Sequence, residues 1–113
     1  MRDDQALLYR LSGDFNPLHA DPEFARKAGF ERPILHGLCT YGITLKAVVD
    51  TLLGGDVTRV RAYATRFAGV VHPGETLRIR MWEDRGESQV HVRVSAADRG
   101  DAPVLTDTVV ALS

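Results

Sequence analysis

Residues 38–55, LCTYGITLKAVVDTLLGG, form the longest apolar segment of the chain. Apolar residues occupy nearly every face of a helix drawn through it. The main polar interruptions, Lys46 and Asp50, lie four residues apart and can pair across one turn. Gly54 and Gly55 end the segment. We predict a helix from about Leu38 to Leu53 that is buried on almost all sides.

Downstream of the two glycines the pattern changes to extended chain. Turn signals occur at 84–86 and 98–101, and His72-Pro73-Gly74 joins the first two extended segments. The predicted strands cover about 57–71, 75–83, 88–97 and 104–112. In the third, Val90, Val92 and Val94 alternate with His91 and Arg93, which gives one apolar and one polar face. A long buried helix followed by such an antiparallel meander indicates an α+β fold, with the sheet wrapped around the helix.

Upstream of the helix, residues 11–19, LSGDFNPLH, combine an acid, an amide and a base in one short loop. Gly13 permits a backbone conformation that other residues resist, and Pro17 pushes Asn16 into the extended region. Asn16 then suits an N-cap and Pro17 a first helical position, so one short turn would direct His19 back toward Asp14. We expect Asp14 and His19 to flank a single water molecule.

Short helices and a second motif complete the N-terminal part. Asp3 or Asp4 can cap a first helix through residues 6–11, and Asp21-Pro22 begins a second at 22–28, which Gly29 ends. Residues 33–37, PILHG, then lead into the long helix. A glycine at a helix start leaves its N–H open to an incoming oxygen, where the helix dipole favours negative charge.

Composition limits the classes of partner. The chain has 113 residues, enough for one domain, and a net charge of -1, which disfavours nucleic acid and anionic membranes as partners. Its one cysteine, Cys39, lies in the apolar run, where a buried structural thiol is expected. No apolar signal segment, membrane-length run or C-terminal Ser-Lys-Leu address is present, so a cytoplasmic location is expected.

Two motifs carry a resemblance to a known family. Residues 9–19, YRLSGDFNPLH, with Asp21-Pro22, and residues 33–42, PILHGLCTYG, resemble the signature of MaoC-like, R-specific enoyl-CoA hydratases. The resemblance is especially close to the C-terminal hot-dog repeat of the hydratase region of peroxisomal multifunctional enzymes. It continues weakly through Arg66-Phe67 and residues 71–82.

The resemblance implies a hot-dog fold and the reversible hydration of trans-2-enoyl-CoA to (R)-3-hydroxyacyl-CoA, without metal or organic cofactor. It matches Asp14 and His19 to the catalytic acid/base pair, Asn16 to the polar residue beside it, and Gly37 to the amide that holds the thioester oxygen. Adding water to such a thioester requires proton removal, proton delivery to the α-carbon and stabilisation of an enolate-like oxygen, which these groups can supply. Which residue of the pair takes the first proton is left open.

Other residues are candidates for contact with the substrate. We place His36, Tyr41 and Phe15 with Gly37 in this group; Tyr41 and Phe15 suit the core equally well, and for His36 we favour a core-facing imidazole bonded to backbone. Asp14, His19 and His36 form a suitable metal-ligand set, but no second signal supports a metal. His72 and His91 are expected at the surface. An arginine could bind the phosphates of coenzyme A, without a preferred candidate.

The resemblance also bears on assembly. Single-chain relatives usually carry further sequence, including a strand, ahead of the Ser-Gly-Asp motif, so residues 1–113 are expected to form one MaoC-like hot-dog domain without that strand. Domains of this family pair through their sheets, which implies a homodimer with acyl-CoA at the seam. Two other hypotheses remain: a related dehydratase or thioesterase acting on another acyl thioester, and a non-catalytic half that completes a partner's acyl pocket.

Overall fold

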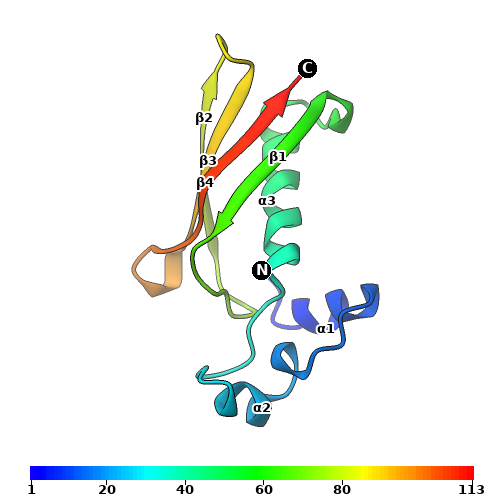
Figure 1. The fold of residues 1–113 in the computed structure, drawn as a ribbon, viewed down its shortest axis with the longest axis vertical. Coiled ribbons are helices and arrows are strands. Elements are labelled where there is room, and N and C mark those ends of the chain that lie inside the picture. Colours follow the sequence, from blue (N-terminus) through cyan, green and yellow to red (C-terminus); the bar gives the residue numbers. More distant parts are fainter.

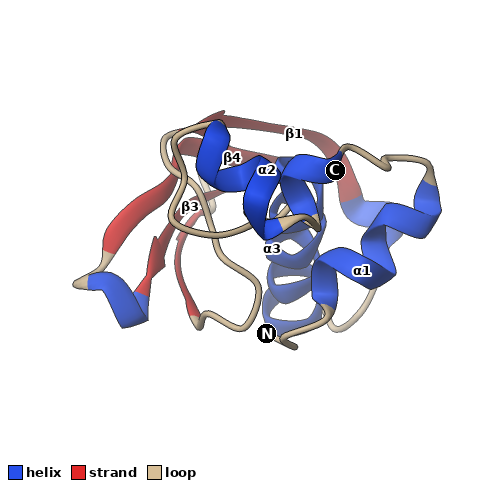
Figure 2. Cartoon of the chain, turned by 90° about the horizontal axis from the view of Figure 1, so that it is seen from below, coloured by secondary structure: helices blue, strands red, loops and turns tan.

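The computed structural model describes residues 1–113, with one four-stranded antiparallel sheet packed against the helix α3, Gly37–Leu52. The helices α1, Gln5–Tyr9, and α2, Pro22–Lys27, lie together beyond the N-terminal end of α3, and the C-terminus lies at the opposite end of the molecule (Figure 1). The view from below shows α1 and α2 at the end of the molecule where α3 begins, next to the two layers formed by α3 and the sheet (Figure 2). The predicted hot-dog arrangement, a sheet wrapped around a long helix, is confirmed.

The helix α3 matches the predicted segment to within one residue at each end. It ends where Leu53 and Gly55 both donate their backbone N–H to the carbonyl of Val49, and Gly54 and Gly55 have φ values of 60° and 83°, which favour glycine. The predicted pairing of Lys46 with Asp50 is confirmed. Burial is less complete than predicted, however. Exposed positions recur every fourth residue along one stripe: Leu38, Gly42, Lys46 and Asp50.

The strands are β1, Val60–Phe67, β2, Leu77–Asp84, β3, Gln89–Ala96, and β4, Ala102–Leu112, in the spatial order β1-β4-β3-β2. The prediction of a simple meander is therefore right for β2 to β4 and wrong for β1, which pairs with β4. The first predicted strand was also too long. Residues 57–59 form a 3₁₀ turn capped by Asp56, whose carboxylate accepts the backbone N–H of Thr58 at 3.0 Å.

The core lies between the inner face of the sheet and α3. The predicted alternation in β3 is confirmed, since Val90, Val92 and Val94 are buried while His91 and Arg93 are exposed. These valines pack in one cluster with Val48 of α3. Burial of such side chains contributes about 1.5–3 kcal/mol each, so the sheet and α3 form the rigid base on which the N-terminal segments rest.

The N-terminal helices fit their predicted positions with one correction. Asp21 caps α2 as predicted, accepting the N–H of Glu23 at 2.9 Å. Asp4 precedes α1 but does not cap it, because its carboxylate is paired with the guanidinium of Arg2, at 2.8 Å from Nε. None of the helices is long and apolar enough to span a bilayer.

Candidate active site

The loop between α1 and α2 has the local geometry that its residue types predict. Gly13 has a φ of 115°, a value that favours glycine, and ends the 3₁₀ turn Arg10–Ser12. Asn16 caps the next 3₁₀ turn, Pro17–His19, by accepting the N–H of Leu18 at 3.0 Å. The Asp14 carboxylate accepts the N–H of Asn16 at 3.2 Å and remains exposed. The cap and this bond fix the spacing between Asp14 and His19.

The half-buried imidazole of His19 is held by one backbone carbonyl. Its Nδ1 lies 2.7 Å from the oxygen of Ile34. A carbonyl can only accept a hydrogen bond, so Nδ1 must carry the proton and, in the neutral ring, Nε2 must be the unprotonated nitrogen. His19, the last residue of the short turn, thus leaves Nε2 as the nitrogen without a backbone partner.

The second imidazole, His36, is buried with 2% of its surface exposed. Its Nε2 donates to the backbone carbonyl of Asp14 at 3.1 Å, as the core-facing interpretation predicts, and its ring stacks on His19 with centroids 3.8 Å apart. Burial lowers the pKa of His36 from its ordinary value, against the opposing effect of the Asp14 carbonyl. The neutral His36 ring is therefore a packing support for His19, and its Nδ1 is buried without a hydrogen-bond partner.

Gly37 begins α3 directly after His36. The N-cap residue His36 has an extended backbone and its side chain does not cap the helix, so first-turn N–H groups are left for another acceptor. The ring of Phe67, at the end of β1, lies over Gly37: a Cβ added there would lie 3.1 Å from Phe67 Cε1. The absence of a side chain keeps this helix start accessible.

These groups meet at one open cleft of about 460 Å³. One donor atom each from Asp14, His19 and His36 lie within 4.8 Å of one another. Two hydrogen bonds that share one water oxygen span up to about 5 Å, so Asp14 and His19 lie within reach of one shared water. The lining consists of Tyr9, Ser12, Gly13, Asp14, His19, His36, Gly37, Leu38 and Phe67.

Three of the sequence-predicted residues lie outside this lining. Asn16 uses its side-chain oxygen as the cap described above. Phe15 is 58% exposed and lies under the guanidinium of Arg10, 5.4 Å from it. Tyr41 stacks on Tyr63 with centroids 3.9 Å apart and donates its hydroxyl to the Tyr63 carbonyl.

Sequence reasoning missed Tyr9, Ser12, Leu38 and Phe67 as parts of the cleft. The ring of Tyr9 lies 4.6 Å from that of His36, centroid to centroid, and no residue pattern around Tyr9 marks this contact. Phe67 is the last residue of β1, about thirty residues after Gly37 in the chain, and lies at the cleft because of where β1 runs. No local signal marks it, because strand placement is a tertiary property.

The donor set Asp14, His19 and His36 contains the ligand types of a two-histidine, one-carboxylate metal site. The stacking of the two rings does not suit it. An ion in the plane of one imidazole, on its lone pair, would lie well out of the plane of the other, because the rings are 3.8 Å apart and tilted by only 27°. The geometry of the three residues therefore does not favour a shared metal ion.

Comparison with known proteins agrees with this architecture. Residues 1–101 match the family model for the MaoC-like domain. The chain is 62% identical over 102 residues to an enoyl-CoA hydratase of Mycobacterium tuberculosis. The matched residues cover 90% of this chain and 35% of that relative. It superposes on the full-length peroxisomal multifunctional enzyme type 2 of Drosophila melanogaster with a TM-score of 0.93 and 41% identity, covering 99% of this chain and 20% of that one.

A smaller protein shares most of its length with the chain. An (R)-hydratase from A. caviae, involved in PHA biosynthesis, superposes with a TM-score of 0.75 and 28% identity, over all of this chain and 89% of that one. The chain thus spans about a third or less of the first two proteins and nearly all of the third. By the match to the family model and the identity to these relatives, the chain belongs to the MaoC-like domain family.

Proposed function

We propose that the chain hydrates trans-2-enoyl-CoA to (R)-3-hydroxyacyl-CoA, and catalyses the reverse dehydration, with Asp14 and His19 as its acid/base pair. The observation that carries the proposal is their placement within one water's span in a cleft that also contains the start of α3. The names of the relatives, enoyl-CoA hydratase and (R)-hydratase, support the reaction and its stereochemistry.

The proposed reaction uses one water held between the two side chains. The base removes a proton from this water, the oxygen bonds to the β-carbon, and the double-bond electrons move onto the thioester oxygen as an enolate. The Gly37 N–H, at the positive end of the α3 dipole, stabilises that oxygen. The proton then passes to the α-carbon on the same face, so water is added without a net change in charge.

We also propose that the working unit is a homodimer. Large apolar side chains remain exposed in the segments that form or border the cleft: Leu11, Phe15, Leu38 and Phe67. Exposed large apolar side chains grouped in neighbouring segments suit an interaction site. A second copy placed over it would close the acyl side of the cleft, which one chain leaves open.

The substrate class defines the metabolic setting that we propose, acyl-CoA turnover in fatty acid metabolism. For the compartment we propose the cytoplasm. Fractionation of cells that produce the tagged protein would test the compartment.

The activity is tested with purified protein and crotonyl-CoA, by following the absorbance of the conjugated thioester. We expect loss of absorbance with the natural sequence. Asp14→Asn and His19→Ala should fold normally and lose about 10²–10⁴-fold in kcat, the usual contribution of general acid/base groups.

Two surface variants provide matched controls, Asp50→Asn on the exposed stripe of α3 and His91→Ala on the outer face of β3. Both should keep the natural rate. No absorbance change at high protein concentration would contradict the proposal, and so would natural rates in the Asp14 and His19 variants.

A further inference from the structure

The carbonyl that orients His19 belongs to a short connecting segment. Ile34 lies in residues 33–35, between α2 and α3, and its carbonyl accepts the hydrogen bond of His19 Nδ1. Its own N–H faces the Leu18 carbonyl at 3.4 Å, a long hydrogen bond. The position of His19 therefore depends on how firmly the other side of this segment is held.

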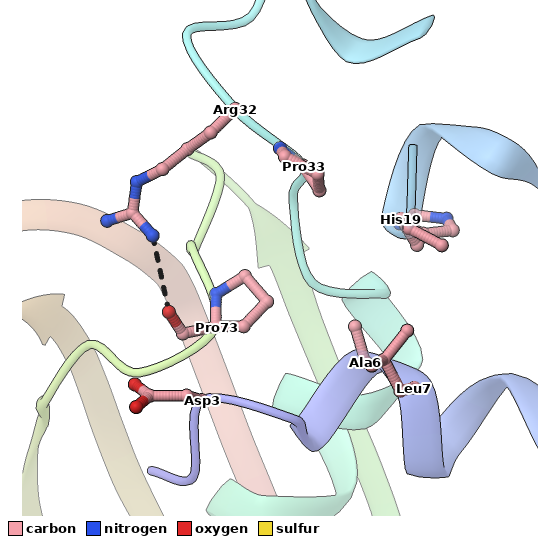
Figure 3. Close-up of a pocket in the computed structure, with 8 residues that line it drawn as sticks. Asp3, Ala6, Leu7, His19, Arg32, Pro33 and Pro73 are labelled. Carbon is pink, nitrogen blue, oxygen red and sulfur yellow. Dashed lines mark hydrogen bonds between the residues drawn. The ribbon is translucent and has the colours of Figure 1, made fainter. Parts of the chain in front are cut away.

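The other side is bound to residues 71–73 by three hydrogen bonds. The N–H of Leu35 donates to Val71 at 2.7 Å, His72 Nδ1 donates to the Pro33 carbonyl at 3.0 Å, and Arg32 donates to the Pro73 carbonyl at 3.3 Å. Figure 3 shows the last of these, with Pro33 between Arg32 and the side of the hollow where His19 lies. Only the His72 bond comes from a buried side chain.

The backbone of His72 is itself held by the buried side chain of Glu75. The prediction of a surface histidine is wrong, since only 7% of its surface is exposed. The backbone N–H of His72 donates to Glu75 Oε1 at 2.7 Å. Arg99 donates to both oxygens of the Glu75 carboxylate, with its Nε 2.6 Å from Oε2. Arg99 also donates to the Val70 carbonyl at 2.6 Å. The buried Glu75 carboxylate is thus paired on both oxygens and anchors the backbone that carries His72.

We propose that His72 is a positioning residue for His19. Its Nδ1–H holds the Pro33 carbonyl, which fixes the neighbouring Ile34 carbonyl, and that carbonyl holds His19 with the proton on Nδ1 and the lone pair on Nε2. His72 does not touch the substrate. The kinetic part of this inference rests on the proposed function, but the state of the His19 ring can be measured without it.

The test uses a pair of substitutions that differ in where they put an amide. Asn places its N–H close to the position of His Nδ1 and can still reach Pro33, whereas Gln places it near that of Nε2 and cannot. Protein with nitrogen-15 histidine has only four rings to resolve. Long-range proton–nitrogen spectra report which nitrogen of each ring is protonated, and single substitutions assign them.

We expect His19 to carry its proton on Nδ1 in the natural protein and in His72→Asn. In His72→Gln the ring should show a mixture of tautomers. With crotonyl-CoA, kcat should fall by about 10²-fold in His72→Gln, the cost of a displacement near 1 Å, with little change in KM, and His72→Asn should recover most of it. His91→Gln is the surface control and should match the natural protein in both measurements.

The inference is overturned if folded His72→Gln keeps both the Nδ1 proton of His19 and the natural kcat. A His72→Leu variant extends the test by removing all polar atoms. If it does not fold, the Asn and Gln pair decides the question alone. A natural protein without hydratase activity would refute the proposed function, while the nitrogen spectra would still decide the role of His72.

Discussion

A Cβ added at Gly37 would make a tight contact, 3.1 Å from Phe67 Cε1. The nearest atoms belong to Phe67, which is 52% exposed and can move by a few tenths of an ångström. We expect Gly37→Ala to lower the free energy of unfolding by about 1 kcal/mol or less, below the about 1–3 kcal/mol typical of overpacked cores. Activity should suffer more, because the thioester oxygen and Phe67 would compete for one space. Crotonyl-CoA kinetics and urea unfolding measure the two effects.

A double substitution shows whether Phe67 causes the loss. Phe67→Leu shortens the side chain that a Cβ at Gly37 would meet. Combined with Gly37→Ala it should restore part of the activity, giving a coupling energy in a double-mutant cycle. Purely additive losses would show that the two positions act separately.

His36 makes folding stability depend on pH in a defined window. Burial lowers the pKa of His36 below its ordinary 6.5. Below pH 6.5 the unfolded chain therefore binds a proton that the folded chain does not, so the free energy of unfolding falls as the pH drops. His36→Gln can keep a donor for the Asp14 carbonyl without titrating. It should flatten this part of the curve in urea unfolding from pH 7.5 to 5, and an unchanged slope would contradict the assignment.

Glu75 acts in a lower window. Burial alone would raise its pKa, but the hydrogen bonds from Arg99 and from the His72 N–H outweigh burial, and the pKa falls below its ordinary 4.5. Stability from this carboxylate is present above pH 4.5 and is lost as the pH falls through the lowered pKa. Glu75→Gln should reduce the acid sensitivity below pH 4.5 and leave the slope near pH 6 unchanged, as acid unfolding curves would show.

Individual residues of the cleft differ in how far sequence could place them. Asp14 and His19 lie five residues apart, in a loop whose conformation Gly13, Asn16 and Pro17 define locally. Phe67 enters through long-range strand pairing. His72 was misplaced for a related reason: a histidine beside Pro73-Gly74 looks like a turn residue until its partners, Pro33 and Glu75, are known.

At the scale of single elements, Asn16 has two candidate roles at the 3₁₀ turn Pro17–His19: a chemical role beside Asp14 and His19, and a structural role as the N-cap. The resemblance to the family gives it a place beside the catalytic pair, and the structure uses its side chain as an N-cap. Loss of an N-cap costs about 0.5–2 kcal/mol, and here it would also loosen the turn that carries His19. We expect Asn16→Ala to reduce kcat, and Asn16→Ser, which can cap, to recover it. Failure of Ser despite a folded turn would indicate a direct chemical role.

The sequence predicts the kinds of element better than their neighbours. Residue alternation identified the inner face of β3, and the glycine pair identified the end of α3. The position of β1 beside β4 could not be read from local patterns, because both edges of a three-stranded meander accept another strand. The exposed stripe of α3 was also hidden, since leucine at position 38 looks buried from composition alone.

At the scale of the whole molecule, the open cleft leads to a prediction about assembly. The apolar side chains exposed around it should be covered in a homodimer, so sedimentation should give twice the 12.4 kDa of one chain. Dilution toward the monomer should reduce the specific activity, because the cleft would reopen. A folded monomer with full activity would contradict the proposed assembly.

The central claim is that one water between Asp14 and His19 supplies both the hydroxyl and the proton to the same face of the substrate. The most direct measurement is hydration of crotonyl-CoA in deuterium oxide, with the configurations at carbons 2 and 3 of the product determined by NMR. We expect an R hydroxyl at carbon 3 and a deuteron added to carbon 2 from the same face. Addition from opposite faces, an S product or no product would contradict it.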